Sequence, residues 1–170
     1  MDIRKITHLA MLISLAVVLN IIESTIPIFN NMLPGVKLGL ANAIIIVVIY
    51  LYTFTDALYV SLGRVFIVGL IRTGLLGIGF FLSLTGAIFS TIIMYLAKRY
   101  TQLSIIGVSI LGAIFHSLGQ VLMAMLLLKT ISLIFYLPYL LLLAIPTGII
   151  VGLMAKNILS LMDKKIALER

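Results

Sequence analysis

Long apolar runs, separated by short polar or glycine- and proline-containing segments, cover most of the chain. A helix needs roughly 20 apolar residues to cross a hydrocarbon core about 30 Å thick. Six runs approach this length, and the second is short. They cover about His8–Ile22, Leu38–Phe54, Ala57–Ile71, Leu75–Ala97, Ser104–Leu128 and Leu133–Met154. The pattern predicts an all-α polytopic membrane bundle of six transmembrane helices, with residues 1–170 forming a single integral membrane domain.

Two segments interrupt this regular pattern. Residues 23–39 contain Pro27 and Pro34 but are too apolar for a purely solvated loop, so we expect them to pack over the outer end of the bundle. The sixth run contains Pro138 and Pro146, and each should remove a helical hydrogen bond and bend the helix. At Pro146 the bend is either a packing kink or a gating hinge.

Composition supports lipid as the solvent, since 63% of the residues are hydrophobic and 10% are charged. A soluble domain of this size has too little interior to bury so many apolar side chains. The absence of cysteine excludes disulfides and thiolate metal sites. The net charge of +7 does not indicate a nucleic-acid partner, because the cations lie at helix ends, where they meet lipid headgroups.

The basic residues give the predicted bundle an orientation. With six helices, eight of the twelve cations fall on one side of the membrane. These eight are Arg4, Lys5, Lys98, Arg99, Lys156, Lys164, Lys165 and Arg170. Cytoplasmic loops carry an excess of Lys and Arg, so both termini are predicted to be cytoplasmic, in a cell membrane.

Polar side chains at membrane depth are the candidates for function, because they are costly there. Arg64 is the clearest case, since an arginine at a helix centre costs about 2.5–3.5 kcal/mol. It must face the interior and meet either carbonyls together with Glu23 or Asp56, or a bound anion. The candidate ligand-binding residues are Glu23, Lys37, Asn42, Arg64, Arg72, His116 and Gln120.

Two groupings of these residues suggest different roles. His116 and Gln120 are four residues apart and share a helix face, which forms either an interhelical hydrogen-bond seam or part of a ligand or proton site. The outer half holds four cations and a single acid, Glu23, which gives a charge balance of +3. The cations are Lys37, Arg64, Arg72 and Lys129. A cavity with this lining would attract a small anionic ligand from outside.

The acids argue against catalysis. The chain has five acidic residues, and no two of them fall close together on an inner helix face. Magnesium–diphosphate chemistry requires clustered carboxylates, so we expect no enzyme activity, no metal site and no cofactor. No Gly-x-x-x-x-Gly-Lys phosphate loop is present, so any ATP-driven work needs a separate subunit.

Four motifs together resemble one family. They are Pro34-Gly-Val-Lys-Leu-Gly-Leu-Ala-Asn42, Gly63-Arg64-Val65, the segment from Gly107 to Gln120, and Pro146-Thr-Gly-Ile-Ile-Val-Gly152. This set is similar to the Gx transporter family, often labelled heptaprenyl diphosphate synthase component I. The resemblance implies a fold like that of the substrate-binding S subunits of energy-coupling-factor (ECF) transporters, with an outward-opening site beneath the first long loop.

The resemblance also implies a partner surface. In S subunits an Ala-x-x-x-Ala groove on the first helix docks a transmembrane coupling subunit, which works with ATPases. Ala10 and Ser14 match this groove in part, although small residues four apart also serve internal packing. Flavin or another cofactor precursor is the ligand class that the resemblance suggests.

The leading hypothesis is therefore a membrane transporter subunit that captures a small anionic ligand from the outer face. The alternative is an accessory membrane subunit of a quinone, isoprenoid or flavin-based electron-transfer pathway, which would bind a lipid or prenyl group. Direct prenyltransferase activity is a third reading, and the scattered acids argue against it.

Overall fold

The computed structural model describes residues 3–25 and 39–168, with side chains over the same ranges except at 73 and 163–168. The α-helices are α1 (Ile3–Thr25), α2 (Leu40–Leu51), α3 (Phe54–Val68), α4 (Ile78–Tyr100), α5 (Ile105–Leu128) and α6 (Leu137–Leu168). A π-helix, η1 (Gly69–Thr73), follows α3, and a 3-10 helix, η2 (Ile131–Tyr136), precedes α6. These ranges contain helices and no strand, which confirms the all-α prediction.

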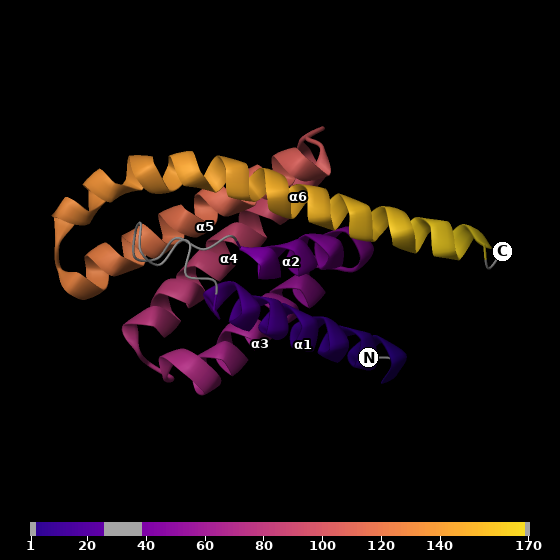
Figure 1. Ribbon diagram of the computed structural model, residues 1–170, viewed down its shortest axis with the longest axis horizontal. Coiled ribbons are helices and arrows are strands. Elements are labelled where there is room, and N and C mark those ends of the chain that lie inside the picture. The colour runs from indigo at the N-terminus through magenta and orange to yellow at the C-terminus, as the bar shows by residue number, and fades with distance from the viewer. Residues whose placement is uncertain (1–2, 26–38, 169–170) are drawn as a thin grey trace.

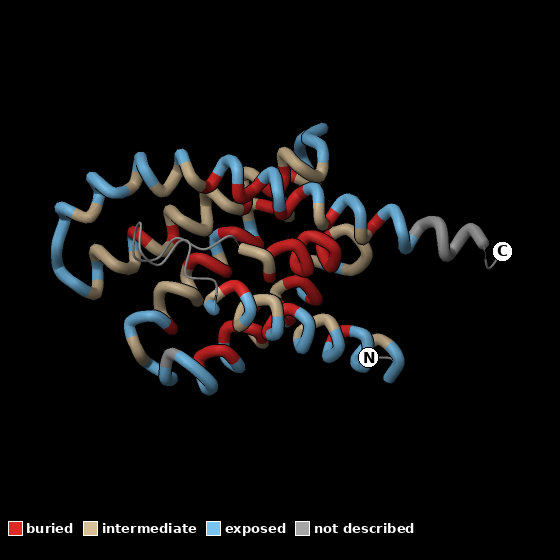
Figure 2. The backbone as a smooth tube through the Cα atoms, viewed as in Figure 1, coloured by how far each residue is buried: buried red, intermediate tan, exposed pale blue. Residues whose placement is uncertain are grey.

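The helices surround α2 (Figure 1). Helix α5 packs between α4 and α6, while α1 and α3 pack against each other on the other side of the bundle. Helix α2 contacts all five of the other α-helices. Buried residues are accordingly concentrated around α2, and exposed residues follow the outer sides of the surrounding helices (Figure 2).

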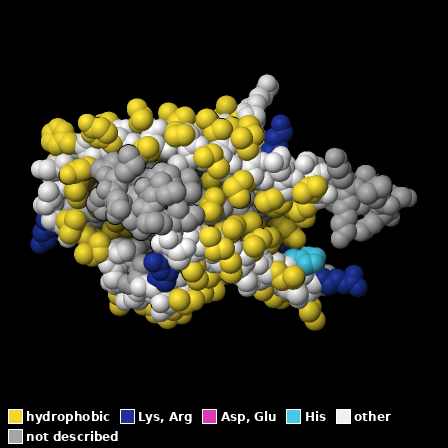
Figure 3. All heavy atoms as spheres, in the orientation of Figure 1, with side chains coloured by type: hydrophobic (Ala, Val, Ile, Leu, Met, Phe, Trp, Pro, Cys, Tyr) yellow, Lys and Arg dark blue, Asp and Glu magenta, His cyan; other side chains and the backbone are white. Residues whose placement is uncertain are grey.

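The surface agrees with a protein embedded in lipid. Five helical segments are long and apolar enough to cross a membrane: Ile3–Thr25, Phe54–Arg72, Ile78–Tyr100, Ile105–Leu128 and Ile131–Met162. Hydrophobic side chains cover much of the face seen in Figure 3, where few Lys and Arg side chains are visible. These features define a helical membrane bundle.

Helix α2 is shorter than the sequence pattern predicts. It has 12 residues rather than the span Leu38–Phe54, and at 1.5 Å per residue it is only about 18 Å long. Its nine consecutive residues 41–49 are all buried. It is therefore an internal helix, covered by protein on every side, and not a sixth helix of full membrane-spanning length.

The C-terminal end of α2 is stabilised by a cation from another helix. Lys98, near the end of α4, donates from Nζ to the carbonyl oxygen of Ile49 at 2.7 Å. The same ammonium lies 4.8 Å from the centre of the Tyr50 ring. Because the last carbonyls of a helix have no partner within it and carry partial negative charge, a cation is the favourable partner there.

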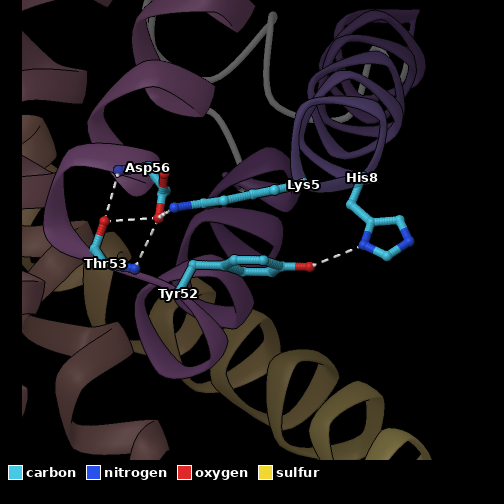
Figure 4. Close-up of polar contacts among 5 residues, drawn as sticks. All are labelled: Lys5, His8, Tyr52, Thr53 and Asp56. Carbon is cyan, nitrogen blue, oxygen red and sulfur yellow. Dashed lines mark hydrogen bonds and ion pairs between the residues drawn. The ribbon is translucent and has the colours of Figure 1, made fainter. Parts of the chain in front are cut away.

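An ion pair holds α1 to α3 at this same end of the bundle (Figure 4). Lys5 Nζ lies 2.8 Å from Asp56 Oδ2, with the side chains 33% and 2% exposed. Asp56 also forms a capping box with Thr53, which begins α3, and the Tyr52 hydroxyl lies 3.5 Å from His8 Nδ1. Asp56 is thus the counter-ion of Lys5 rather than of Arg64.

The prolines of the last helix differ in position. Pro138 is the second residue of α6, where proline is tolerated because first-turn N–H groups have no intrahelical partner. The expected bend at Pro138 is therefore wrong. Pro146 lies inside the helix, as predicted. Helix α6 continues to Leu168, well past the predicted end at Met154.

The start of α1 and the end of α6 lie at the same end of the bundle (Figure 1). The contacts of Lys5 with the start of α3 and of Lys98 with the end of α2 place these two cations at that end as well. Helix η1 and the connection from α5 to η2 lie at the opposite end. An even number of crossings, as predicted from the sequence, brings both ends of the chain to the same end of the bundle, and this is the arrangement observed.

Glycines allow three helices to approach closely. A Cβ at Gly119 would lie 3.0 Å from the carbonyl oxygen of Thr85, so α5 and α4 touch through their backbones. A Cβ at Gly148 would lie 2.7 Å from Ile110 Cα, and one at Gly152 would lie 2.8 Å from Ile106 Cα. Small residues drive such packing in lipid, where no hydrophobic effect brings helices together.

The Gly148 contact gives a test of this packing. Gly148→Ala should destabilise the protein by about 1–3 kcal/mol, because the added methyl meets backbone that cannot move aside without separating α5 from α6. Gly107→Ala is the matched control on α5, since the nearest atom to its Cβ would be a leucine side chain at 3.3 Å. Thermal unfolding in detergent measures both. Equal melting temperatures for the two variants would contradict the packing model.

Candidate functional site

A polar cavity lies where α1 ends and α2 begins. Its lining comes from five α-helices, η1 and the residue preceding α2: Asn20, Glu23, Gly39, Asn42, Arg64, Val65, Val68, Gly69, Phe80, Ser83 and His116. The cavity volume is about 20 Å³, which is room for about one water molecule. Four of the predicted site residues therefore converge on one cavity: Glu23, Asn42, Arg64 and His116.

Arg64 is the principal charge of the cavity. It is 4% exposed, which confirms that it faces the interior. Its Nη1 donates to Asn42 Oδ1 at 3.2 Å, and its Nε has no hydrogen-bond partner among the described residues. A buried donor without a partner is costly, so this N–H is available to a ligand group or a water.

Glu23 provides the counter-charge, and it also caps α2. Its carboxylate accepts hydrogen bonds from the backbone N–H of Gly39 at 2.6 Å and of Leu40 at 3.1 Å. It lines the same cavity as the Arg64 guanidinium, which carries the opposite charge. Gly39 has φ +77°, a left-handed conformation that glycine adopts without strain. Of the two acids considered as partners of Arg64, Glu23 is the one at the cavity.

Asn20 and Ser83 line the cavity without having been predicted as site residues. Asn20 precedes Glu23 by three residues on α1, so the helical spacing alone places both on one face. Its Oδ1 is buried and has no hydrogen-bond partner among the described residues. Ser83 lies on α4, and the sequence carries no signal that distinguishes it from other helical serines.

The face of α5 that carries His116 and Gln120 packs on α4. A Cβ at Gly86 would lie 3.0 Å from both His116 Cε1 and Gln120 Cγ. His116 also lines the cavity, and Gln120 does not. The predicted face therefore combines two roles. Gln120 lies at the contact between α4 and α5, and His116 lies both at that contact and at the cavity.

The remaining predicted residues lie elsewhere. Arg72 is exposed, belongs to η1 and does not line the cavity, and Lys37 falls outside the described residues. Lys129 is exposed at the end of α5. Ala10 and Ser14 are both exposed on α1, where Ser14 Oγ donates to the carbonyl of Ala10 at 3.0 Å.

The chemistry of the lining matches an oxyanion group or a polar group that both donates and accepts, while the cavity as it stands has room for about one water molecule. Arg64 Nε–H is a donor, Asn20 Oδ1 an acceptor, and the start of α2 is electropositive. A metal is a poorer fit, because the described residues contain no group of three His, Cys, Asp or Glu that could hold one.

The fold and the cavity together define a helical membrane protein with a charged internal site. A family model described as heptaprenyl diphosphate synthase component I matches residues 12–158. The chain belongs to that family, which confirms the resemblance in the sequence. No curated protein and no solved structure matches the chain.

The buried Arg64–Asn42 pair gives a test of whether this site serves stability. Asn42→Leu should destabilise the protein by about 1–3 kcal/mol, because it removes the acceptor of a buried charge. The double variant Asn42→Leu/Arg64→Met should recover this loss or exceed wild type, since apolar replacement of a buried polar pair is often neutral or stabilising. Thermal unfolding in detergent checks both. A double variant less stable than Asn42→Leu would show that Arg64 is structural.

Proposed function

We propose that this protein is a substrate-binding membrane subunit, similar to an ECF S component, that captures a small anionic ligand from the outer face of the cell membrane. The observation that carries the proposal is the buried guanidinium of Arg64 in a polar cavity, with its Nε unbonded among the described residues. A charge kept at such cost in lipid usually serves function.

The ligand group proposed for the cavity is a carboxylate or phosphate. Guanidinium N–H groups and helix N-termini both favour oxyanions, and Arg64 and the start of α2 meet at this cavity. The volume of about 20 Å³ holds about one water molecule, so the oxyanion has to take the place of a group now in the cavity. The body of a flavin or other cofactor precursor would lie outside the cavity or require the helices to move.

A non-catalytic role is part of the proposal. The two acids Glu23 and Asp56 lie at opposite ends of the bundle, and each is engaged with backbone N–H groups or a lysine. They do not form the carboxylate cluster on which magnesium–diphosphate chemistry depends. The family's synthase label therefore finds no support in their positions.

Transport by such a subunit requires a partner, and α1 offers a surface for one. Ala10 and Ser14 are exposed small residues on its outer side, and small residues allow another transmembrane helix to approach closely. We propose a transmembrane coupling subunit with ATPases as the partner, because the chain lacks a phosphate loop of its own.

Replacing Arg64 tests the ligand site. Arg64→Met should abolish binding of the co-purifying ligand, detected by native mass spectrometry, because the cavity loses its only guanidinium among the described lining residues. Arg72→Met is the matched control, since Arg72 is exposed and away from the cavity. Ligand retained by folded Arg64→Met would place the site elsewhere. A co-purifying quinone or prenyl lipid would favour the accessory electron-transfer role.

The orientation can be tested because the chain has no cysteine. Single cysteines at the exposed positions Gln102 and Thr130 lie in the connections after α4 and after α5, at the two ends of the bundle. In intact cells a membrane-impermeant maleimide should label Thr130→Cys and spare Gln102→Cys, because the cation-rich end faces the cytoplasm. The reverse pattern would mean that the cavity opens inward.

A further inference from the structure

The Glu23 carboxylate lies where the proposed ligand group would bind. It accepts hydrogen bonds from two successive N–H groups, of Gly39 and Leu40, at the start of α2. The side chain of Arg64, which carries the opposite charge, lines the same cavity. A free carboxylate or phosphate could accept from the same two amides, and the Arg64 guanidinium in the same cavity would add a charged donor.

We propose that Glu23 is a tethered occupant of the anion site, and that the ligand's oxyanion replaces its carboxylate at Arg64 and the start of α2. This inference rests on the proposed function. Replacement is favoured over joint binding for two reasons. Two anions in a poorly solvated cavity repel strongly, and a volume of about 20 Å³ leaves no room for a second oxyanion group.

The unliganded protein needs such an occupant. The first N–H groups of a helix have no partner within the helix, and at the half-buried residues Gly39 and Leu40 a side-chain acceptor takes that role. Glu23 satisfies the amides of Gly39 and Leu40 in the absence of ligand and balances Arg64.

Glu23 is also placed so that it can leave. Helix α1 is described as far as Thr25, two residues beyond Glu23, and the sequence continues to Pro27, a residue that interrupts helices. Helix ends open more easily than helix centres. Because the tethered carboxylate competes at high effective concentration, only a ligand with a strong anionic group displaces it. The site should therefore prefer phosphate over carboxylate.

Small anions test this exchange directly. Glu23→Ala leaves the site without its occupant, so acetate or inorganic phosphate should raise the melting temperature of this variant in a saturable manner, relative to chloride at equal ionic strength. Wild type should respond weakly. The response should disappear in Glu23→Ala/Arg64→Met, because the second change removes the charge that binds the anion.

A second variant covers the case in which Glu23→Ala does not fold. Glu23→Gln keeps one side-chain acceptor but removes the negative charge, so it should bind inorganic phosphate roughly tenfold to a hundredfold more tightly than wild type, measured by titration calorimetry. Asp56→Asn is the control for losing a buried acid away from the cavity, and it should leave phosphate affinity unchanged.

The outcomes separate the two proposals. If folded Glu23→Ala ignores both anions, or Glu23→Gln binds phosphate no better than wild type, Glu23 is a structural cap only and the exchange is wrong. Loss of native ligand in Arg64→Met would still support the binding subunit in that case. The anion responses could also appear while no ligand co-purifies, or while the co-purifying ligand binds independently of Arg64. In that case the exchange is supported and the transport role is overturned.

Discussion

The two ends of α2 set the constraint on which the rest of the structure depends. A 12-residue helix inside a membrane protein has unpaired N–H groups at one end and unpaired carbonyls at the other, and both ends of α2 are half-buried. Glu23 from α1 binds the first end and Lys98 from α4 binds the second. Both charges match the helix dipole, so α1 and α4 are tied to the central helix at opposite ends.

The cavity follows from this arrangement. Because α2 stops short, its N-terminus lies inside the bundle beside Arg64 on α3, and the surrounding helices supply polar side chains around it. Replacing a buried polar pair by apolar groups of the same shape is often neutral or stabilising. Arg64 therefore differs from Glu23 and Lys98, because its contact with Asn42 joins no helix end.

Most of the helices could be predicted from the sequence, and so could the inward position of Arg64, since both follow from the length of apolar runs and the cost of charge in lipid. The end of α2 could have been found from the Thr53-x-x-Asp56 capping pattern, which marks the start of α3. Arg72 and Gln120 were grouped with the site because sequence gives depth in the membrane but not direction around the bundle. Arg72 belongs to the π-helix that follows α3, and its direction around the bundle therefore differs from the one that a continued α-helix would give.

The glycine contacts of α4, α5 and α6 have a mechanical consequence. At Gly119, Gly148 and Gly152 a neighbouring backbone occupies the place of the missing side chain, and backbone cannot rotate aside as a side chain does. Sliding these three helices past each other would drive main chain into main chain. They should therefore resist sliding as one unit, whereas the α1–α3 contact, where a Cβ at Gly63 would meet only the side chain of Ile13, can yield more easily to a bulky molecule.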